Sequence, residues 1–357
     1  MSYDYKEIVP YLLHWFDYNA RILPWRENPK PYYVWISEIM LQQTRVEAVK
    51  GYFDRFITAL PDIRSLAEAE EERLLKLWEG LGYYSRVRNL KKTAQIVIRD
   101  YGGELPSEYS ELMKLPGIGT YTAGAVASIA FGKAIPAVDG NVLRVTKRLA
   151  GSFEDISKES VKKELIAELT VIIPKDHPGD FNQALMELGA TVCLPNGKPL
   201  CAKCPVMHLC RAFHQDIVME LPVKPDKKER KRVERTILLM EYQDRYIIRK
   251  RPDQGLLAGL WELPGIEEHL TLQGVRRILK EWGLAIDEIE PMGKAKHIFS
   301  HIEWHMLGYR IRLKELADGY PEGSQVRWAD KQEIREVYAL PNAFAAYTDI
   351  ITEDKPE

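Results

Sequence analysis

All four cysteines of the chain lie within one short segment. The chain has 357 residues, and its cysteines are Cys193, Cys201, Cys204 and Cys210, in the pattern C-x7-C-x2-C-x5-C. Secreted disulfide scaffolds are shorter and spread their cysteines along the chain, so this cluster is typical of a metal site. Four thiolates can close a tetrahedral zinc site or hold a [4Fe–4S] cluster. Most zinc ribbons present two separated close pairs and this segment has one, which favours the cluster and leaves zinc as the alternative.

Composition and length describe a cytoplasmic protein of two or three domains. The 50 Lys and Arg and the 52 Asp and Glu give a formal net charge of -2. That balance excludes a uniformly basic coat for nucleic acid, but it allows a local basic patch. No apolar run approaches the roughly 18 residues that a membrane span needs. The first ten residues lack the apolar stretch of a secretory signal, so we expect a cytoplasmic protein without a membrane partner.

Apolar periodicity separates a helical part from a mixed part. In residues 1–220 apolar side chains recur at intervals of three and four, with Pro and Gly between segments, which predicts an all-α domain. The predicted helices are 5–19, 34–59, 70–78, 85–101, 121–131 and 160–169. The charged segment 221–235, with two prolines, predicts a linker. Beyond it, a β-hairpin at 236–250, a helix at 272–282 and an alternating strand at 302–313 predict an α+β domain.

A glycine-containing hairpin joins two of the predicted helices. The sequence LPGIGTYTA begins at Leu115 and contains Gly117 and Gly119, which allow positive φ and close backbone approach. The amides there and at the start of the second helix can bind an anion together. The segment is typical of a helix–hairpin–helix element that binds DNA phosphates without reading sequence, and a simple tight turn is the alternative.

Two carboxylates stand in settings that suit acid–base chemistry. Asp139 precedes Gly140, which alone favours an N-cap of a following helix. Glu38 lies among apolar residues, so burial should raise its pKa and keep a proton available near neutral pH; an exposed glutamate is the alternative. A phosphate-binding hairpin with a proton donor and a second carboxylate fits cleavage of a glycosidic bond in DNA, after the nucleotide is flipped out of the stack.

These features together resemble a known superfamily. The hairpin, the downstream Asp139 and the cysteine segment are similar to the DNA glycosylases with a Gly/Pro-rich loop and a catalytic aspartate. Within that group, the segments 23–46 and 78–90 and the C-terminal domain resemble the adenine DNA glycosylase, or MutY, family over essentially the whole chain.

The resemblance implies a fold and its domain boundaries. We expect an all-α, two-lobed helix–hairpin–helix glycosylase domain at 1–220 with a four-cysteine iron–sulfur loop, then the linker 221–235 and a C-terminal α+β Nudix-like domain at 236–357. The expected lobes are a six-helix lobe at about 24–131 and an iron–sulfur lobe at about 1–23 and 132–220. The resemblance also implies that the metal is a [4Fe–4S] cluster with a structural and DNA-positioning role.

The same resemblance implies the catalytic roles. Glu38 would protonate adenine at N7, and Asp139 would stabilise the positively charged sugar before water adds. Asn141 would position the water or Asp139. Tyr121 stands where related glycosylase/lyases carry a Schiff-base lysine, so the enzyme is expected to be monofunctional and to leave an abasic site.

Binding residues follow from the matched motifs. The adenine pocket is expected to contain Trp25, Arg26 and Gln183. The duplex would be contacted by Gln43, Tyr83, Arg86, Gly117 and Gly119. Recognition of 8-oxoguanine would use Phe299, Ser300 and His301.

Basic side chains near these motifs mark the expected path of the DNA phosphates. Counting Lys and Arg against Asp and Glu gives -1 for residues 1–220, +6 for 221–252 and -7 for 253–357, so the near-neutral total hides a basic connector. Within the helical part, the expected phosphate contacts are Arg86, Arg88, Lys91, Lys92, Arg144, Lys147 and Arg148.

Two departures from the family pattern and one difference from the Nudix hydrolases affect these expectations. The first cysteine gap is seven residues where six is usual, so the loop that follows Cys193 contains one extra residue. Gln183 stands where some members carry glutamate. The helix at 272–282 lacks the acidic run that binds magnesium in Nudix hydrolases, so the C-terminal domain is expected to bind without hydrolysing.

We therefore expect a monomeric base-excision repair enzyme that hydrolyses the N-glycosidic bond of adenine opposite 8-oxoguanine or guanine in double-stranded DNA. In a bacterium it would be cytoplasmic and associated with the nucleoid. The sequence leaves room for a clamp partner that it does not identify. The alternatives are another helix–hairpin–helix glycosylase, acting on thymine or an oxidised pyrimidine, and a non-catalytic iron–sulfur DNA-binding protein.

Overall fold

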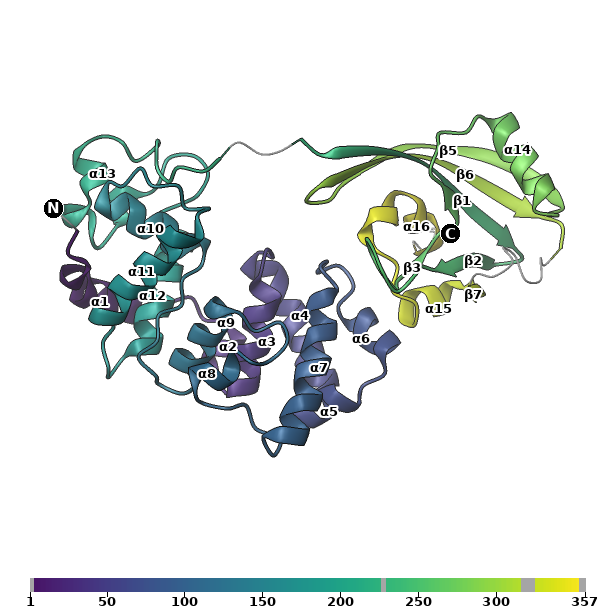
Figure 1. Ribbon diagram of the computed structural model, residues 1–357. Coiled ribbons are helices and arrows are strands. Elements are labelled where there is room, and N and C mark those ends of the chain that lie inside the picture. Colours follow the sequence, from purple (N-terminus) through teal and green to yellow (C-terminus); the bar gives the residue numbers. More distant parts are fainter. Residues whose placement is uncertain (1–2, 226–228, 316–324, 353–357) are drawn as a thin grey trace. The chain divides into compact units, whose positions relative to one another are not determined.

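The computed structural model describes residues 3–225, 229–315 and 325–352, which divide into two units (Figure 1). The helical unit comprises the described residues of 1–69 and 89–226. The sheet unit comprises the described residues of 70–88 and 227–357. Within these described ranges, every helix is too short or too polar to cross a lipid bilayer.

Short helices joined by turns build the helical unit, as predicted. Its α-helices are α1 (Val9–Asn19), α2 (Pro24–Glu27), α3 (Pro31–Leu41), α4 (Val46–Ala59), α5 (Ile63–Glu68), most of α7 (Ser85–Asp100), α8 (Tyr109–Leu112), α9 (Thr120–Ala125), α10 (Gly140–Ala150), α11 (Glu159–Ile172), α12 (Pro178–Thr191) and α13 (Arg211–His214). A π-helical turn, η2 (Val126–Ala130), continues α9, and the 3-10 turns are η1 (Tyr5–Ile8), η3 (Cys201–Lys203) and η4 (Met207–Leu209).

The helix predicted at 34–59 is wrong in one respect, because the structure has two helices there. α3 ends at Leu41 and α4 begins at Val46, and between them Gln43 has a φ of 60°, in the left-handed region. The break contains neither glycine nor proline, so apolar periodicity alone carried the prediction through it. The turn exposes Gln43 at the end of α3, three residues after the last buried side chain of that helix.

The cysteine segment is anchored on a helical core. Apolar side chains of α1, α10, α11 and α12 form this core, and Leu12, Leu165 and Phe181 within it are completely buried. Cys193, Cys204 and Cys210 pack against the same core. Burying these side chains supplies the main driving force for this lobe, so the thiols stand on a rigid base.

A mixed seven-stranded sheet with helices on both faces forms the sheet unit (Figure 1). Its strands are β1 (Lys231–Tyr242), β2 (Arg245–Lys250), β3 (Trp261–Glu262), β4 (Gly265–Ile266), β5 (Ile286–Ile298), β6 (Ile302–Leu313) and β7 (Val326–Asp330). Its helices are α6 (Glu71–Leu77), α14 (Leu272–Glu281), α15 (Lys331–Glu336) and α16 (Ala345–Thr352), with the 3-10 turn η5 (Asn342–Phe344).

Strand β1 lies at the centre of the sheet and contributes to two cores. The strand order is β3-β2-β1-β6-β5, with β4 paired to β1 and β7 to β2. Ile237 and Leu239 pack in one core with Tyr347 of α16, while Leu238 and Met240 pack in the other core, which α14 covers. This alternation is what a strand buried on both faces requires.

Strand β1 begins inside the segment predicted as linker. It starts at Lys231 and pairs in parallel with β6 from Lys231 opposite Ile302 to Glu241 opposite Arg312. Main-chain hydrogen bonds hold this extension. Lys231, Arg232 and Glu234 are exposed, and Arg235 is buried against Glu262, so the extension left no apolar signal in the sequence.

Residues 70–88 group with the sheet unit through specific contacts. The Lys76 Nζ donates to the main-chain oxygens of Ile334 at 2.9 Å and Tyr338 at 3.2 Å. The Glu79 carboxylate accepts from the Leu340 amide at 2.6 Å. The domain boundary at 220 stays a prediction from sequence, and these contacts show where the described residues associate.

Candidate active site

Glu38 is buried on α3, as its apolar neighbours predict. Pro31 starts this helix, and the side chains around Glu38 include Trp35 and Ile39, which are almost completely buried. Glu38 itself is 5% exposed, which excludes the alternative of a solvent-facing glutamate. Burial raises the pKa of Glu38 to about 7, because removing water destabilises the carboxylate.

Tyr121 faces Glu38 from the first turn of α9. Its hydroxyl donates a short hydrogen bond to Glu38 Oε2 and also contacts the sulfur of Met186 at 3.5 Å. Burial and the nearby carboxylates raise the pKa of Tyr121 well above its ordinary value, so the phenol keeps its proton. The donated bond lowers the pKa of Glu38, opposing the effect of burial.

Asp139 caps α10 and also faces a cavity. Its Oδ1 accepts from the Val142 amide at 2.8 Å, and its Oδ2 accepts from Asn141 Nδ2 at 2.7 Å. Burial raises the pKa of Asp139 and these donated bonds oppose the rise. The N-cap and the candidate catalytic roles predicted from sequence therefore fall on the same side chain.

The cavity beside Asp139 brings together residues from distant parts of the chain. It has a volume of about 720 Å³ and lies within the helical unit. Its lining includes Gln43, Arg45, Tyr121, Asp139 and Lys162. It also contains Gly119 and Asn141, so the hairpin, the turn after α3 and the start of α10 meet around one space open to a ligand.

The two hairpin glycines differ in conformation. Gly117 has a φ of +76°, and a Cβ there would lie 2.8 Å from the Cβ of Asn89. Gly119 has a φ of -96° and a ψ of -177°, which any residue adopts, and a Cβ there would meet open space. The expectation of positive φ is therefore confirmed for Gly117 and wrong for Gly119, which serves as the N-cap residue of α9.

The residues expected in the adenine pocket form part of an ion cluster. Arg26 Nε donates to Gln183 Oε1 at 2.9 Å, and Arg26 Nη2 donates to Glu187 Oε2 at 2.9 Å. Trp25 is buried with its ring centroid 5.3 Å from that of Phe53. Arg26 and Gln183 thus lie together and line a cavity separate from the one beside Asp139, while Trp25 packs in the interior; their role in an adenine pocket stays a prediction.

Several basic residues expected at phosphates are engaged inside the protein. Arg144, Lys147 and Arg148 are each 4% exposed. Arg144 donates to the main-chain oxygens of Cys193 at 2.9 Å and Gly189 at 2.7 Å, and to Asn141 Oδ1 at 2.9 Å. The expected contact with DNA phosphates is wrong for these three residues. The face of α10 that carries them points into the protein, where their charged groups bind buried acceptors.

Lys147 and Arg148 have partners of their own. Lys147 Nζ pairs with Glu154 Oε2 at 2.6 Å. Arg148 donates to the main-chain oxygens of Leu221 at 2.8 Å and Leu194 at 2.9 Å. The two Arg148 bonds connect α10 to the residue after Cys193 and to the segment that follows Cys210.

Arg86 and Arg88 also bind the protein itself. Arg86 donates to the main-chain oxygens of Leu81 at 2.9 Å and Gly82 at 3.1 Å, and its guanidinium lies over the rings of Trp78 and Tyr83. Burial lowers the pKa of Arg86 to about 10. Arg86 thus holds the turn that carries Tyr83, and its contact with DNA stays a prediction. Arg88 pairs with Glu71 at 2.7 Å. Of the basic cluster, Lys92 remains exposed and Lys91 half-buried.

The two residues expected to enter the duplex both adopt strained backbone conformations. Gln43 in the helical unit has a φ of 60°, and Tyr83 in the sheet unit has a φ of 46°. Non-glycine residues at positive φ are uncommon and concentrate at functional sites. Tyr83 is 49% exposed despite its large ring.

The Phe299–His301 turn lies beside Tyr83 within the sheet unit. The Tyr83 hydroxyl is 2.7 Å from Ser300 Oγ. Phe299 packs against the ring of Trp304 at a centroid distance of 4.9 Å, while Ser300 and His301 are exposed. These side chains line one cavity of about 830 Å³ with the turn at 80–84.

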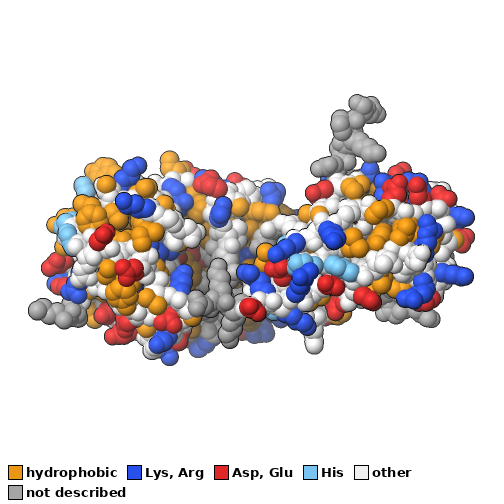
Figure 2. Space-filling view, turned by 90° about the horizontal axis from the view of Figure 1, so that it is seen from above, with side chains coloured by type: hydrophobic (Ala, Val, Ile, Leu, Met, Phe, Trp, Pro, Cys, Tyr) orange, Lys and Arg blue, Asp and Glu red, His pale blue; other side chains and the backbone are white. Residues whose placement is uncertain are grey.

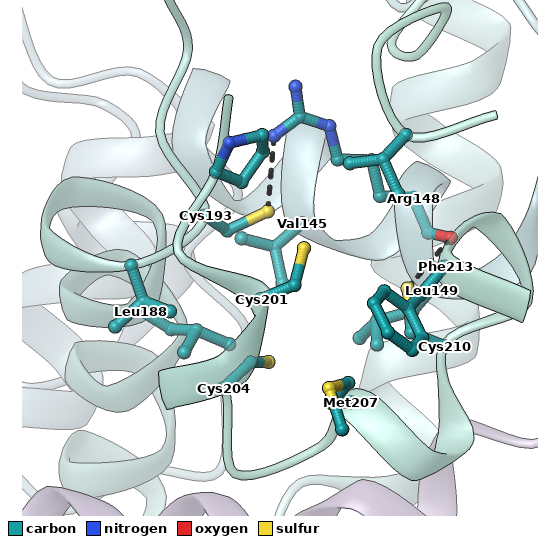
Figure 3. A pocket seen from close by; sticks show the side chains of 13 residues that line it. Val145, Arg148, Leu149, Leu188, Cys193, Cys201, Cys204, Met207, Cys210 and Phe213 are labelled. Atoms are coloured by element: carbon teal, nitrogen blue, oxygen red, sulfur yellow. Dashed lines mark hydrogen bonds between the residues drawn. The ribbon is translucent and has the colours of Figure 1, made fainter. Parts of the chain in front are cut away.

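The four cysteines surround a single cavity on the core described above (Figure 3). Arg148 Nη1 donates to Cys193 Sγ at 3.3 Å, and burial raises the pKa of Cys204 to about 12. The remaining lining is mostly apolar. As the side chains stand in the described ranges, no three of His, Cys, Asp and Glu converge to hold a single metal ion.

Two protein families match the chain. The HhH-GPD superfamily of base excision DNA repair proteins matches residues 36–169, and the NUDIX domain matches residues 235–349. The adenine DNA glycosylase of Mus musculus is 35% identical, over 95% of this chain and 77% of its own length. The chain belongs to the adenine DNA glycosylase family.

Solved structures of other glycosylases match a smaller part of this chain than the adenine DNA glycosylase does. A thermostable thymine-DNA glycosylase has a TM-score of 0.53 and 32% identity, covering 59% of this chain and 96% of its own. An endonuclease III trapped on DNA has a TM-score of 0.51 and 30% identity, covering 59% of this chain and 98% of its own. The adenine DNA glycosylase match extends over both units, so it outweighs the thymine alternative.

Family membership confirms the expected fold and enzyme class. The chain is an all-α helix–hairpin–helix glycosylase with an added Nudix-like α+β domain. It is a hydrolase of N-glycosidic bonds in base excision repair and a DNA-binding protein, which argues against the alternative of a non-catalytic sensor.

Sequence reasoning missed three residues of this glycosylase on α12. Asn182 Nδ2 donates to Ser128 Oγ at 2.8 Å, and its Oδ1 accepts from the Ala137 amide at 3.0 Å, two residues before Asp139. Met186 contacts Tyr121, and Glu187 contacts Arg26. Asn182 and Met186 are four residues apart and share a helix face, whereas Glu187 points to an adjacent face; the sequence does not say which distant segment either face meets.

Proposed function

We propose that this glycosylase removes adenine paired with 8-oxoguanine or guanine in double-stranded DNA, by monofunctional hydrolysis. The observation that carries the proposal is the buried Glu38, bonded to Tyr121, with Asp139 lining the same cavity as Tyr121. A protonatable acid and a second carboxylate are what cleavage through an oxocarbenium-like state requires.

Glu38 supplies the proton in this mechanism. Tyr121 donates to Oε2, so the acid proton resides on Oε1 and is directed away from the phenol. Transfer of that proton to N7 of a flipped adenine makes the base a neutral leaving group. The bond from C1′ to N9 then breaks, its electron pair stays with the base, and the sugar becomes an oxocarbenium ion.

Asp139 stabilises the sugar cation and completes hydrolysis. Its carboxylate is held by Val142 and Asn141, which fix it without neutralising it. Water adds to C1′ and passes a proton to this carboxylate, leaving an abasic site. Tyr121 has no amine, so no imine with the sugar forms at that position and the strand remains intact.

Recognition of the opposite base belongs to the sheet unit in this proposal. Tyr83 and Ser300 lie within hydrogen-bond distance of each other and line one cavity with Phe299 and His301. Serine and histidine offer donors and acceptors to the altered edge of 8-oxoguanine. Gln43 and the Gly117–Gly119 hairpin would contact the duplex from the helical unit.

A [4Fe–4S] cluster is proposed for the cysteine cavity. The donor set fits, because four thiols and Arg148 are the polar groups of an otherwise apolar lining, and thiolates are the ligands that such clusters use. Cys193, Cys201, Cys204 and Cys210 would hold the cluster, which would fix this loop and supply no step of the reaction. Anaerobically purified protein should be brown and contain about four irons per chain; a colourless protein with one zinc would contradict this assignment.

The glycosylase test uses duplexes that contain one A:8-oxoguanine or A:G pair. Incubation followed by alkali should cut the adenine strand at the target position, and omission of alkali should leave that strand intact. A duplex with A:T is the matched control. Failure to release adenine from either mispair would contradict the proposal.

The test of lesion recognition uses Ser300→Ala and Tyr83→Phe. Each removes one partner of the same hydrogen bond, so each should reduce the preference for A:8-oxoguanine over A:G while leaving A:G turnover nearly unchanged. Equal losses on both duplexes would remove Ser300 from lesion recognition. We also propose a monomer located with the DNA in the cytoplasm of a bacterium, which size-exclusion chromatography and cell fractionation can check.

A further inference from the structure

Glu187 is a buried carboxylate that binds two arginines. It is 1% exposed on α12, and burial of an unpaired carboxylate would be strongly unfavourable. Arg21 Nε donates to its Oε1 at 2.6 Å, and Arg21 Nη2 and Arg26 Nη2 donate to its Oε2 at 3.0 Å and 2.9 Å. These bonds lower the pKa of Glu187, so it stays ionised.

Arg26 donates to three acceptors, two of them on α12 and one in the segment before α2. Its Nη2 binds Glu187, its Nη1 donates to the main-chain oxygen of Arg21 at 3.2 Å, and its Nε donates to Gln183 Oε1 at 2.9 Å. A planar guanidinium bound at three nitrogens has little freedom to turn. Glu187 is the only charged acceptor among the three, so it contributes most to this arrangement.

The position of Arg26 determines which end of the Gln183 amide is available. Arginine Nε can only donate, so the atom facing it must be the amide oxygen. The Gln183 amide NH₂ therefore points elsewhere, and within the described ranges no side chain or main-chain group accepts from it. An NH₂ group selects acceptors: adenine has an unprotonated N1, whereas N1 of hypoxanthine or guanine carries a hydrogen.

We propose that Glu187 is a positioning residue for base recognition, which holds Arg26 and thereby turns the Gln183 NH₂ group toward the flipped base. The site then favours purines whose N1 accepts a hydrogen bond. This inference rests on the proposed removal of adenine, and it adds the group that sets the polarity of the pocket. The competing explanation is that Glu187 only ties α12 to the segment before α2.

The experiment measures single-turnover excision with enzyme in excess, on duplexes with adenine or hypoxanthine opposite 8-oxoguanine. The variants are Glu187→Gln, Gln183→Ala and the two combined. Duplex affinity is measured separately for each by equilibrium binding. Glu154→Gln is the matched control, because it removes the carboxylate partner of the buried Lys147 in the same unit without touching Arg26.

We expect Glu187→Gln to slow adenine excision by about tenfold or more, with duplex affinity changed by less than about threefold. Its rate on hypoxanthine relative to adenine should rise, because a released Gln183 amide can turn its oxygen toward N1–H. In the Gln183→Ala background the same substitution should have little further effect, since residues that act through one another are not additive. Glu154→Gln should match the wild type in both ratios.

Equal factors in both backgrounds, or an unchanged hypoxanthine-to-adenine ratio, would show that Glu187 is a structural tie and overturn the proposal. If Glu187→Gln does not fold, Glu187→Asp keeps the charge, retracts it from Arg26 and is held to the same criteria. A wild-type enzyme inactive on adenine would refute the proposed function itself, whereas an active wild type with a normal Glu187→Gln variant would refute only this inference.

Discussion

At the residue scale, the chemistry depends on one buried hydrogen bond. Tyr121 and Glu38 share it, and the phenol keeps its proton while the carboxyl titrates near neutrality. Burial and the hydrogen bond shift the pKa of Glu38 in opposite directions, and burial prevails. The acid is thus about half protonated near pH 7, which suits a general acid in neutral solution.

Replacing Glu38 tests that role directly. We expect Glu38→Gln to abolish adenine release while duplex binding persists, because the amide keeps the shape but has no proton to transfer. In the wild type the single-turnover rate should fall about tenfold per pH unit above about pH 7, the pKa of Glu38. A pH-independent rate between pH 6 and 9, or near-normal turnover by the variant, would remove Glu38 from this role.

The same titration affects stability. The pKa of Glu38 is higher in the folded protein than in the unfolded chain, so folding retains a proton and stability decreases as pH rises from about 4.5 to about 7. Glu38→Gln removes this dependence, and its melting temperature should exceed that of the wild type by more at pH 8 than at pH 5. A difference independent of pH would contradict the assigned shift.

At the scale of elements, three segments place side chains around the site: the start of α10, the hairpin before α9, and α12. In each segment the same residues stabilise the fold and contribute to the site. Asp139 caps α10, Gly117 turns the hairpin tightly against Asn89, and the α12 side chains contact both Tyr121 and Arg26.

The two roles of Asp139 can be separated by a pair of variants. Asp139→Asn keeps the oxygen that caps α10 and loses the charge, so stability should change little while excision falls by about 100-fold or more. Asp139→Ala loses both and should also cost about 1 kcal/mol of stability. Chemical denaturation and single-turnover kinetics check these effects; equal stability of the two variants would argue against the cap.

The hairpin glycines offer a second matched pair. Gly117→Ala should destabilise the protein by about 1–2 kcal/mol, because a side chain at positive φ is strained and its Cβ would contact Asn89. Gly119→Ala should be within about 0.5 kcal/mol of the wild type, but its Cβ would project into open space where a phosphate is expected. Weaker duplex binding by Gly119→Ala with unchanged stability is the expected result; normal binding would place the phosphate elsewhere.

Local sequence patterns predicted these elements, but they did not predict which distant residues the elements contact. The apolar neighbours of Glu38 predicted its burial, and the Asp139-Gly140 pair predicted a helix cap. Both signals come from residues that are close to each other in the sequence. The pairing of Arg26 with Glu187 joins positions 161 residues apart, and no periodicity encodes it. The basic side chains also led to a wrong prediction. Arg144 and Arg148 were expected to contact DNA phosphates, but packing of α10 against the cysteine segment directs both side chains into the protein.

At the scale of the whole molecule, net charge is a poor guide to DNA binding. The chain carries -2 overall, and Figure 2 shows Lys and Arg interspersed with Asp and Glu over the visible face. The cavity beside Asp139 nevertheless has Arg45 and Lys162 in its lining. Cations placed where phosphates pass, and not the total, determine the electrostatic part of binding.

Duplex affinity should therefore decrease with salt in spite of the acidic total. A plot of log affinity against log salt concentration gives a slope that reflects the number of phosphates contacted. Arg45→Gln and Lys162→Gln should each reduce this slope by about one. Lys163→Gln, at the next and exposed position of α11, is the control and should leave it unchanged; identical slopes for Lys162→Gln and Lys163→Gln would exclude Lys162 from phosphate contact.

Gly189 has a consequence for inherited variation. A Cβ at this position would lie 2.6 Å from the Cβ of Asn141, and the Gly189 oxygen accepts from Arg144. A change to alanine adds one methyl group and no charge, so a survey of natural alleles that ranks substitutions by chemical similarity would classify it as harmless. The added methyl group would instead force Asn141 to move and so disturb the hydrogen bond that Asn141 donates to Asp139. A lineage that carries Gly189→Ala would make a full-length glycosylase with a disturbed active site, and under the proposed function it would accumulate mutations at oxidised guanines.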